Sequence, residues 1–123
     1  KHCYCNSDSS FENCCEPYLN KQTLPITPEQ LMRSRYSAYV LQNADYLMET
    51  THVSERKHYS KSEILEWAKS NTWMKLEVIK ALDDIVEFKA YYLDSTLKAK
   101  IHHEKSSFKQ ENGVWFYVDG EFY

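Results

Sequence analysis

The sequence predicts an α+β fold in which three helices are followed by a four-stranded antiparallel sheet. Apolar residues follow a helical spacing between residues 28 and 70, and the spacing changes to alternation from about residue 74. The pair Asn112-Gly113, the strongest hairpin signal in the chain, separates the last two alternating segments. Helices that precede a run of antiparallel strands typically cover one face of the sheet.

Length and composition limit the class of protein. The chain has 123 residues, enough for one hydrophobic core but not for two ordinary domains. Aromatic residues make up 15% of the chain, which argues against disorder. The net charge of -3, with lysines and glutamates interspersed, disfavours nucleic-acid binding. No apolar run approaches the roughly 18 residues of a membrane span, and no signal-peptide pattern is present. We therefore expect a soluble, cytoplasmic protein.

The first predicted helix spans Pro28 to Val40. Thr27 is a good N-cap, proline suits the first helical position, and Gln30 completes a capping box. Helical spacing predicts a buried stripe of Leu31, Met32, Tyr36, Ala38, Tyr39 and Val40. This helix is expected to organise the core and to form one wall of any pocket.

Two arginines lie on this helix. Arg35 falls at the border of the apolar stripe or within it, whereas Arg33 points more toward solvent. A buried guanidinium requires a carboxylate or several carbonyls as partners. Arg35 is thus either a structural cation in an ion pair or an anion-binding group in a pocket.

The remaining helices are shorter. A second helix is predicted over residues 44–50, and a polar loop over 51–59. Ser60 and Glu63 form a second capping box, so a third helix is predicted over 60–70.

Alternation of apolar and polar residues predicts four half-buried strands. They cover about 74–78, 86–92, 97–110 and 114–118. The third is less regular near His102, where a bulge would redirect side chains.

All four cysteines lie near the amino terminus, at Cys3, Cys5, Cys14 and Cys15. Four thiolates from two close pairs can surround a tetrahedral Zn²⁺, whose binding folds a segment too small to build a core. The alternative is two disulfides in an oxidising compartment. His2 and the pair His102-His103 are substitute ligands of lower rank.

The spacing C-x-C-x8-C-C, with Ser7 inside and Phe11 before the second pair, resembles the SEC-C motif, a short zinc-binding segment. That motif usually carries glycines where this chain has Asn6 and Asp8, the non-glycine residues that best tolerate positive φ. The resemblance implies that the four cysteines are zinc ligands. We expect a zinc knuckle at residues 1–19, ahead of a main domain at 27–123.

Several runs in the main domain resemble the YchJ-like family. They are residues 31–40 (LMRSRYSAYV), 45–47 (DYL), Trp67, 73–76 (WMKL), 103–104 (HE), Phe108, 113–115 (GVW) and 117–120 (YVDG). Those proteins carry a SEC-C motif ahead of a domain similar to nuclear transport factor 2. The resemblance implies a cone-shaped fold in which a curved sheet and a long first helix enclose a cavity. It implies no established reaction.

The candidate residues of this cavity are Arg33, Arg35, Tyr36, Tyr39, Trp67, Trp73, His103 and Glu104. Adjacent strand residues point to opposite faces, so at most one of His103 and Glu104 faces inward unless a bulge intervenes. An inward Glu104 is the natural partner of Arg35, and an inward His103 is a candidate general base. The alternative is that this pair is structural and that the aromatic residues are core.

Two functions from different classes follow. The first is a non-enzymatic zinc-binding adaptor, whose knuckle docks a protein partner and whose cavity holds a small ligand. The second is a small-molecule enzyme, an isomerase, dehydratase or hydrolase, with His103 or Glu104 as acid or base and Arg35 orienting an anion. Fold analogy alone supports the enzyme. A homodimer through the outer face of the sheet, with Tyr91 and Tyr117 exposed, is a further expectation.

Overall fold

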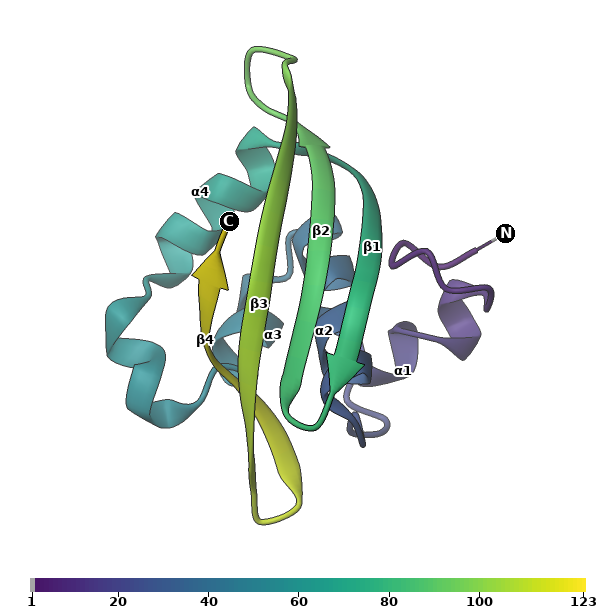
Figure 1. Cartoon of the computed structure of the whole chain (residues 1–123), viewed down its shortest axis with the longest axis vertical. Helices are drawn as coiled ribbons and strands as arrows, with labels where there is room; N and C mark the ends of the chain where they lie inside the picture. Colours follow the sequence, from purple (N-terminus) through teal and green to yellow (C-terminus); the bar gives the residue numbers. More distant parts are fainter. Residues whose placement is uncertain (1) are drawn as a thin grey trace.

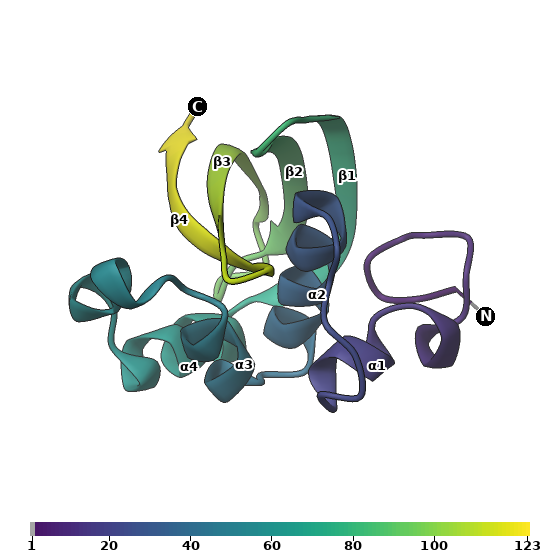
Figure 2. The same ribbon diagram turned by 90° about the horizontal axis from the view of Figure 1, so that it is seen from below.

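Helices pack against one face of a curved antiparallel sheet in the computed structural model, which describes residues 2–123 (Figures 1 and 2). The helical elements are η1 (Phe11–Asn13), α1 (Glu16–Leu19), α2 (Pro28–Val40), α3 (Ala44–Glu49), η2 (Val53–His58) and α4 (Lys61–Ser70). The strands are β1 (Thr72–Leu82), β2 (Ile85–Leu93), β3 (Ala99–Glu111) and β4 (Val114–Phe122). The predicted α+β class is confirmed.

Helix α2 has the predicted bounds and lies along the concave side of the sheet (Figure 2). The Thr27 hydroxyl accepts a hydrogen bond from the Gln30 amide at 3.1 Å. The Gln30 side chain reaches back one residue further than the capping-box pattern requires and accepts from the Ile26 amide at 2.8 Å. Of the predicted apolar stripe, Leu31, Met32, Tyr36 and Ala38 are buried, whereas Tyr39 and Val40 are half-buried. Two serines on the helix are buried as well.

The other predicted helices are present with side-chain caps. The Asn43 side chain accepts from the Tyr46 amide at the start of α3, and Ser60 accepts from the Glu63 amide at the start of α4. Three short elements were not predicted: η1 lies between the cysteine pairs, α1 lies in the segment after the cysteines, and η2 lies in the polar loop. Each has six residues or fewer, too short for its periodicity to be read.

The strands form a meander in the order β1-β2-β3-β4. Asn112 and Gly113 both have positive φ, as the predicted hairpin turn between β3 and β4 requires. The pairing of β2 with β3 is continuous, so the bulge predicted near His102 is wrong. The irregularity in β3 lies instead between Ser107 and Phe108, where it pairs with β4.

One hydrophobic cluster joins the sheet, α2 and the amino-terminal segment. The buried side chains are Cys3, Cys5, Cys15, Leu31, Met32, Tyr36, Leu76, Val86, Phe88, Ala90, Phe108 and Tyr117. Cys3, Cys5 and Cys15 therefore belong to the same hydrophobic core as the inner face of the sheet. Within residues 2–123, no helix is long and apolar enough to cross a membrane.

Candidate functional site

The four cysteine sulfurs converge into one cluster. All four Sγ atoms lie within 4.8 Å of one another, with 3.7 Å between those of Cys5 and Cys14 and 3.9 Å between those of Cys14 and Cys15. Sulfurs at the corners of a tetrahedral zinc site are about 3.8 Å apart, given Zn–S bonds of about 2.3 Å. All four cysteines are free, so the structure lacks the alternative disulfides.

The loop between the cysteine pairs is held by its polar residues. Asn6 has a φ of 67°, as expected for a position usually occupied by glycine, whereas Asp8 does not adopt positive φ. The Asn6 side chain accepts from the Leu76 amide of β1 at 2.8 Å, which fixes the loop to the sheet. The Ser7 hydroxyl donates to Cys14 Sγ at 3.1 Å.

Helix α2 supplies further contacts to the cluster. Arg33 donates to the Cys5 carbonyl at 2.9 Å, and its Nε pairs with Glu29 at 3.0 Å. A hydrogen bond from Cys15 lowers the pKa of the Cys5 thiol to about 4, and burial raises the pKa of Cys14 to about 11. Arg33 was predicted to line the cavity, and that prediction is wrong: the cysteine segment covers the helix face that the periodicity assigned to solvent.

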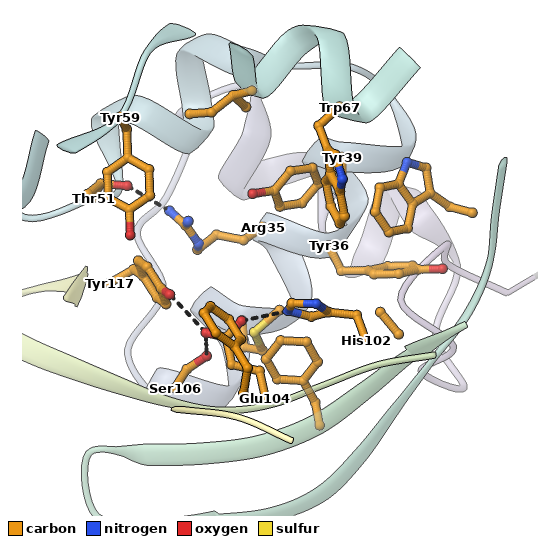
Figure 3. Close-up of a pocket in the computed structure, with 16 residues that line it drawn as sticks. Arg35, Tyr36, Tyr39, Thr51, Tyr59, Trp67, His102, Glu104, Ser106 and Tyr117 are labelled. Carbon is orange, nitrogen blue, oxygen red and sulfur yellow. Dashed lines mark hydrogen bonds and ion pairs between the residues drawn. The ribbon is translucent and has the colours of Figure 1, made fainter. Parts of the chain in front are cut away.

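A cavity of about 210 Å³ lies between α2 and α4 on one side and the sheet on the other (Figure 3). The predicted candidates along it are Arg35, Tyr36, Tyr39, Trp67, Trp73 and Glu104. The cavity is also lined by residues that were not among the predicted candidates, namely Met32, Thr51, Tyr59, Ile64, Phe88, Ala90, His102, Ser106, Tyr117 and Phe122. Aromatic rings line one side, and the polar groups gather on β3 and around Arg35 (Figure 3).

Glu104 is the centre of a hydrogen-bonded network on β3. Its side chain accepts from His102 Nε2 at 2.8 Å, from the Ser106 hydroxyl at 2.7 Å and from the Tyr117 hydroxyl at 2.8 Å. Burial by itself would raise the pKa of Glu104, but the hydrogen bonds from His102, Ser106 and Tyr117 outweigh it, and the pKa falls below its usual value. Glu104 is therefore a carboxylate at neutral pH.

Gly120 makes room for this carboxylate. It pairs with Ser106 across β3 and β4, and a Cβ atom added to it would lie only 2.6 Å from Glu104 Cδ. Glycine at this position is thus explained by the close approach of the Glu104 side chain.

His103 was predicted to line the cavity, but it lies outside it. Its Nε2 is 2.7 Å from a Glu87 carboxylate oxygen, and its ring stacks on Tyr123 with 4.6 Å between centroids. Because β3 has no bulge at this point, alternation places His102 and Glu104 on the inner face and His103 on the outer one. Counting by two from the inward-facing Phe108 would have identified His102.

Arg35 is 7% exposed and enters the cavity from α2. Its Nη1 donates to the Leu47 carbonyl at 3.0 Å, to Thr50 Oγ1 at 2.7 Å and to Thr51 Oγ1 at 3.3 Å. The guanidinium carbon lies 4.4 Å from the centroid of the Tyr117 ring. These contacts bind α2 to the end of α3.

The predicted ion pair between Arg35 and Glu104 is wrong. No carboxylate lies within 4.0 Å of the guanidinium among the residues that the structure describes. Tyr117 contacts both groups instead, Arg35 through its ring and Glu104 through its hydroxyl. Tyr117 is 8% exposed on the inner face, so it cannot share an outer-face dimer surface with Tyr91 as predicted.

Comparison with known proteins finds relatives over nearly the whole chain. The family model described as "YchJ, middle NTF2-like domain" matches residues 27–120. A UPF0225 protein of Actinobacillus succinogenes is 38% identical over 95% of this chain and 79% of its own length. One of Vibrio vulnificus is 42% identical over 98% of this chain and 74% of its own length.

Two solved structures share the fold. A SEC-C motif containing protein from Rhodopseudomonas palustris has a TM-score of 0.93 at 32% identity and covers 98% of both chains. Another from Psychrobacter arcticus has a TM-score of 0.78 at 29% identity, over 95% of this chain and 80% of its own.

The Glu104 network predicts a pH dependence of stability. The ordinary pKa of a glutamate is 4.5, and the folded-state pKa of Glu104 is lower. The contribution of Glu104 is therefore complete above pH 4.5 and is lost as the pH falls through the lower folded-state value. Glu104→Gln should reduce the free energy of unfolding by about 1–3 kcal/mol at neutral pH, and the reduction should shrink in acid.

Urea unfolding of both proteins across the acid range measures this difference. Glu87→Gln is the matched control, because Glu87 also pairs with a histidine but lies on the outer face. A gap between wild type and Glu104→Gln that stays constant down to the lowest pH would contradict the assignment.

Proposed function

The chain belongs to the YchJ-like family, with its NTF2-like domain at residues 27–120, and on that premise we propose a zinc-stabilised domain that binds a small molecule in its cavity. The observation that carries the proposal is the unfilled space beside Arg35 and the Glu104 network. Pockets with apolar walls and a few converging polar groups are typical ligand sites. The predicted protein partner of the knuckle stays a prediction.

The cysteine cluster supports a structural zinc site. Its sulfur separations fit a tetrahedral ion, and four thiolate ligands leave no open coordination position for a substrate. Zinc would supply cross-linking, joining Cys3 and Cys5 to Cys14 and Cys15. Because three of these side chains pack in the core beside α2, the ion would stabilise one wall of the cavity.

Elemental analysis tests the metal. Protein purified without added zinc should contain about one equivalent, and Cys14→Ser should lose it because one of four ligands is removed. Ser9→Ala, at an exposed position in the same loop, should retain it. Absence of zinc from the wild type, with disulfides detected by mass spectrometry, would refute the assignment.

The size and lining of the cavity limit its ligand. Four aromatic side chains line one side of the cavity: Tyr36 and Tyr39 from α2, Trp67 from α4 and Trp73 from β1. An apolar cavity of roughly 150 Å³ accepts benzene. A space of about 210 Å³ therefore suits a single ring with a small polar substituent.

A cavity-filling substitution tests this binding. Ala90 is buried on β2 and lines the cavity, so Ala90→Leu should weaken the binding of benzyl alcohol by about tenfold or more. Ala81→Leu makes the same change at an exposed position of β1 and should leave binding intact. Amide NMR shifts give the affinity, and equal binding by both variants would exclude the cavity as the site.

The bond between His102 and Glu104 favours a second candidate function, proton transfer on a bound molecule. A carboxylate only accepts hydrogen bonds, so His102 Nε2 carries the hydrogen, and the neutral ring keeps its lone pair on Nδ1. A histidine held in this way by a carboxylate can act as a general base. His102 thus takes the role first considered for His103.

The tautomer of His102 is measurable. Long-range ¹⁵N–¹H correlation spectra should give the Nε2–H form in the wild type, because Glu104 accepts that hydrogen. The Glu104→Gln variant should give a mixture of tautomers, since an amide can accept or donate. An Nδ1–H form in the wild type would rule out the proposed base.

A further inference from the structure

We propose that the cavity recognises the carboxylate of a small aromatic acid through the free edge of Arg35. The inference rests on the proposed function, since it assigns a chemical class to the molecule that the cavity binds. Arg35 is more than nine-tenths buried, lines the cavity and carries a permanent charge.

The hydrogen bonds of Arg35 use only part of its guanidinium. All three come from Nη1, and they go to Leu47, Thr50 and Thr51. Nε and Nη2 have no hydrogen-bond partner within residues 2–123. No fully buried side-chain nitrogen or oxygen in that part of the chain lacks a partner, so these two atoms retain contact with open space. Arg35 lines the cavity, so the cavity is the open space next to its side chain.

Nε and Nη2 form one edge of a planar fork. Two parallel N–H groups on such an edge match the two oxygens of a carboxylate, and the resulting pair of charge-assisted bonds is stronger than bonds to neutral acceptors. Nη1 is meanwhile fixed by α3, and Tyr117 lies against the flat face of the group (Figure 3). The edge is therefore held in place before a ligand arrives.

The charge of Arg35 also lacks a counter-ion. Its protein partners are one carbonyl, two hydroxyls and the Tyr117 ring, all of them neutral. Glu104, the carboxylate on the cavity wall, already accepts three hydrogen bonds. A buried cation without a paired anion is costly, and an anionic ligand removes that cost.

The other two arginines differ from Arg35 in the hydrogen bonding of Nε. Arg33 donates its Nε to Glu29, and Arg56 donates its Nε to the Thr51 carbonyl. Arg35 is the one arginine of the three whose Nε has no acceptor in the described part of the chain. The free edge formed by Nε and Nη2 is therefore specific to Arg35 and is not shared by the other two arginines.

The rest of the cavity favours a ring with one carboxylate. No lysine and no second arginine is found along the cavity lining within the described residues, so a single negative charge suits it better than a dianionic phosphate. The aromatic wall of Tyr39, Trp67 and Trp73 suits a flat apolar body. The volume of about 210 Å³ limits that body to about one ring.

Titration of the full chain with benzoate and benzyl alcohol tests the inference. Benzoate should bind about tenfold more tightly, because only it can pair with the Arg35 edge. The Nε–H signal of Arg35 should move in ¹H–¹⁵N spectra on saturation with benzoate and stay in place with benzyl alcohol. Arg35→Lys, which removes that signal, assigns it, and Arg56→Lys is the matched control.

Arg35 also joins α2 to the end of α3, so a substitution of Arg35 can disturb the fold. The deciding measurement is therefore the Arg35 Nε–H signal of the wild-type protein, which does not require a variant to bind ligand. Saturation by benzoate with an unmoved Arg35 signal overturns the carboxylate assignment. Benzyl alcohol binding as tightly as benzoate overturns it as well and leaves the proposed cavity intact. Failure of both compounds to shift any cavity resonance overturns both proposals.

Discussion

Helix α2 carries two arginines that face opposite sides of the molecule, and each holds a different segment of the chain against the helix. Arg33 and Arg35 lie about 200° apart around the helix axis. Arg33 holds the cysteine segment through the Cys5 carbonyl, and Arg35 holds the end of α3 through Nη1. The helix is therefore fixed between a candidate metal site and a candidate ligand site. Movement of α2 would disturb both, because Cys5 and Tyr36 share one hydrophobic cluster.

The polar inner face of β3 explains why the cavity stays open. A sheet that packs on a helix normally presents apolar side chains, yet here His102, Glu104 and Ser106 face inward along one strand. These side chains are hydrogen-bonded to one another, so none of them needs a partner on α2. Gly120 on β4 leaves the space that the network occupies. The apolar residues of α2 and α4 complete the walls.

Local sequence signals predicted the elements well and their tertiary contacts less well. Caps at Thr27 and Ser60 and the Asn112-Gly113 turn act within a few residues, so the sequence identifies them directly. The cysteine spacing likewise identified the cluster. Arg33 was misplaced because the segment that covers it lies about 28 residues earlier, and no local pattern reports that contact.

The errors at the cavity have two causes, strand register and the packing of one helix on another. A bulge expected near His102 left the inward residue undecided, and the regular pairing of β2 and β3 resolves it in favour of His102 and Glu104. The acceptors of Arg35 follow α3 at Thr50 and Thr51, a position set by how two helices pack. Alternation alone predicted an inward Glu104 as one option but not the Tyr117 ring beside Arg35.

A crystal structure of the protein grown with saturating benzoate tests most directly whether α2 and the sheet enclose a site for a small aromatic acid. We expect electron density for the ring against Trp67 and Tyr39, with both carboxylate oxygens within hydrogen-bonding distance of Nε and Nη2 of Arg35, about 2.7–3.2 Å. Density for water alone in the cavity, or a benzoate bound elsewhere on the molecule, would contradict it.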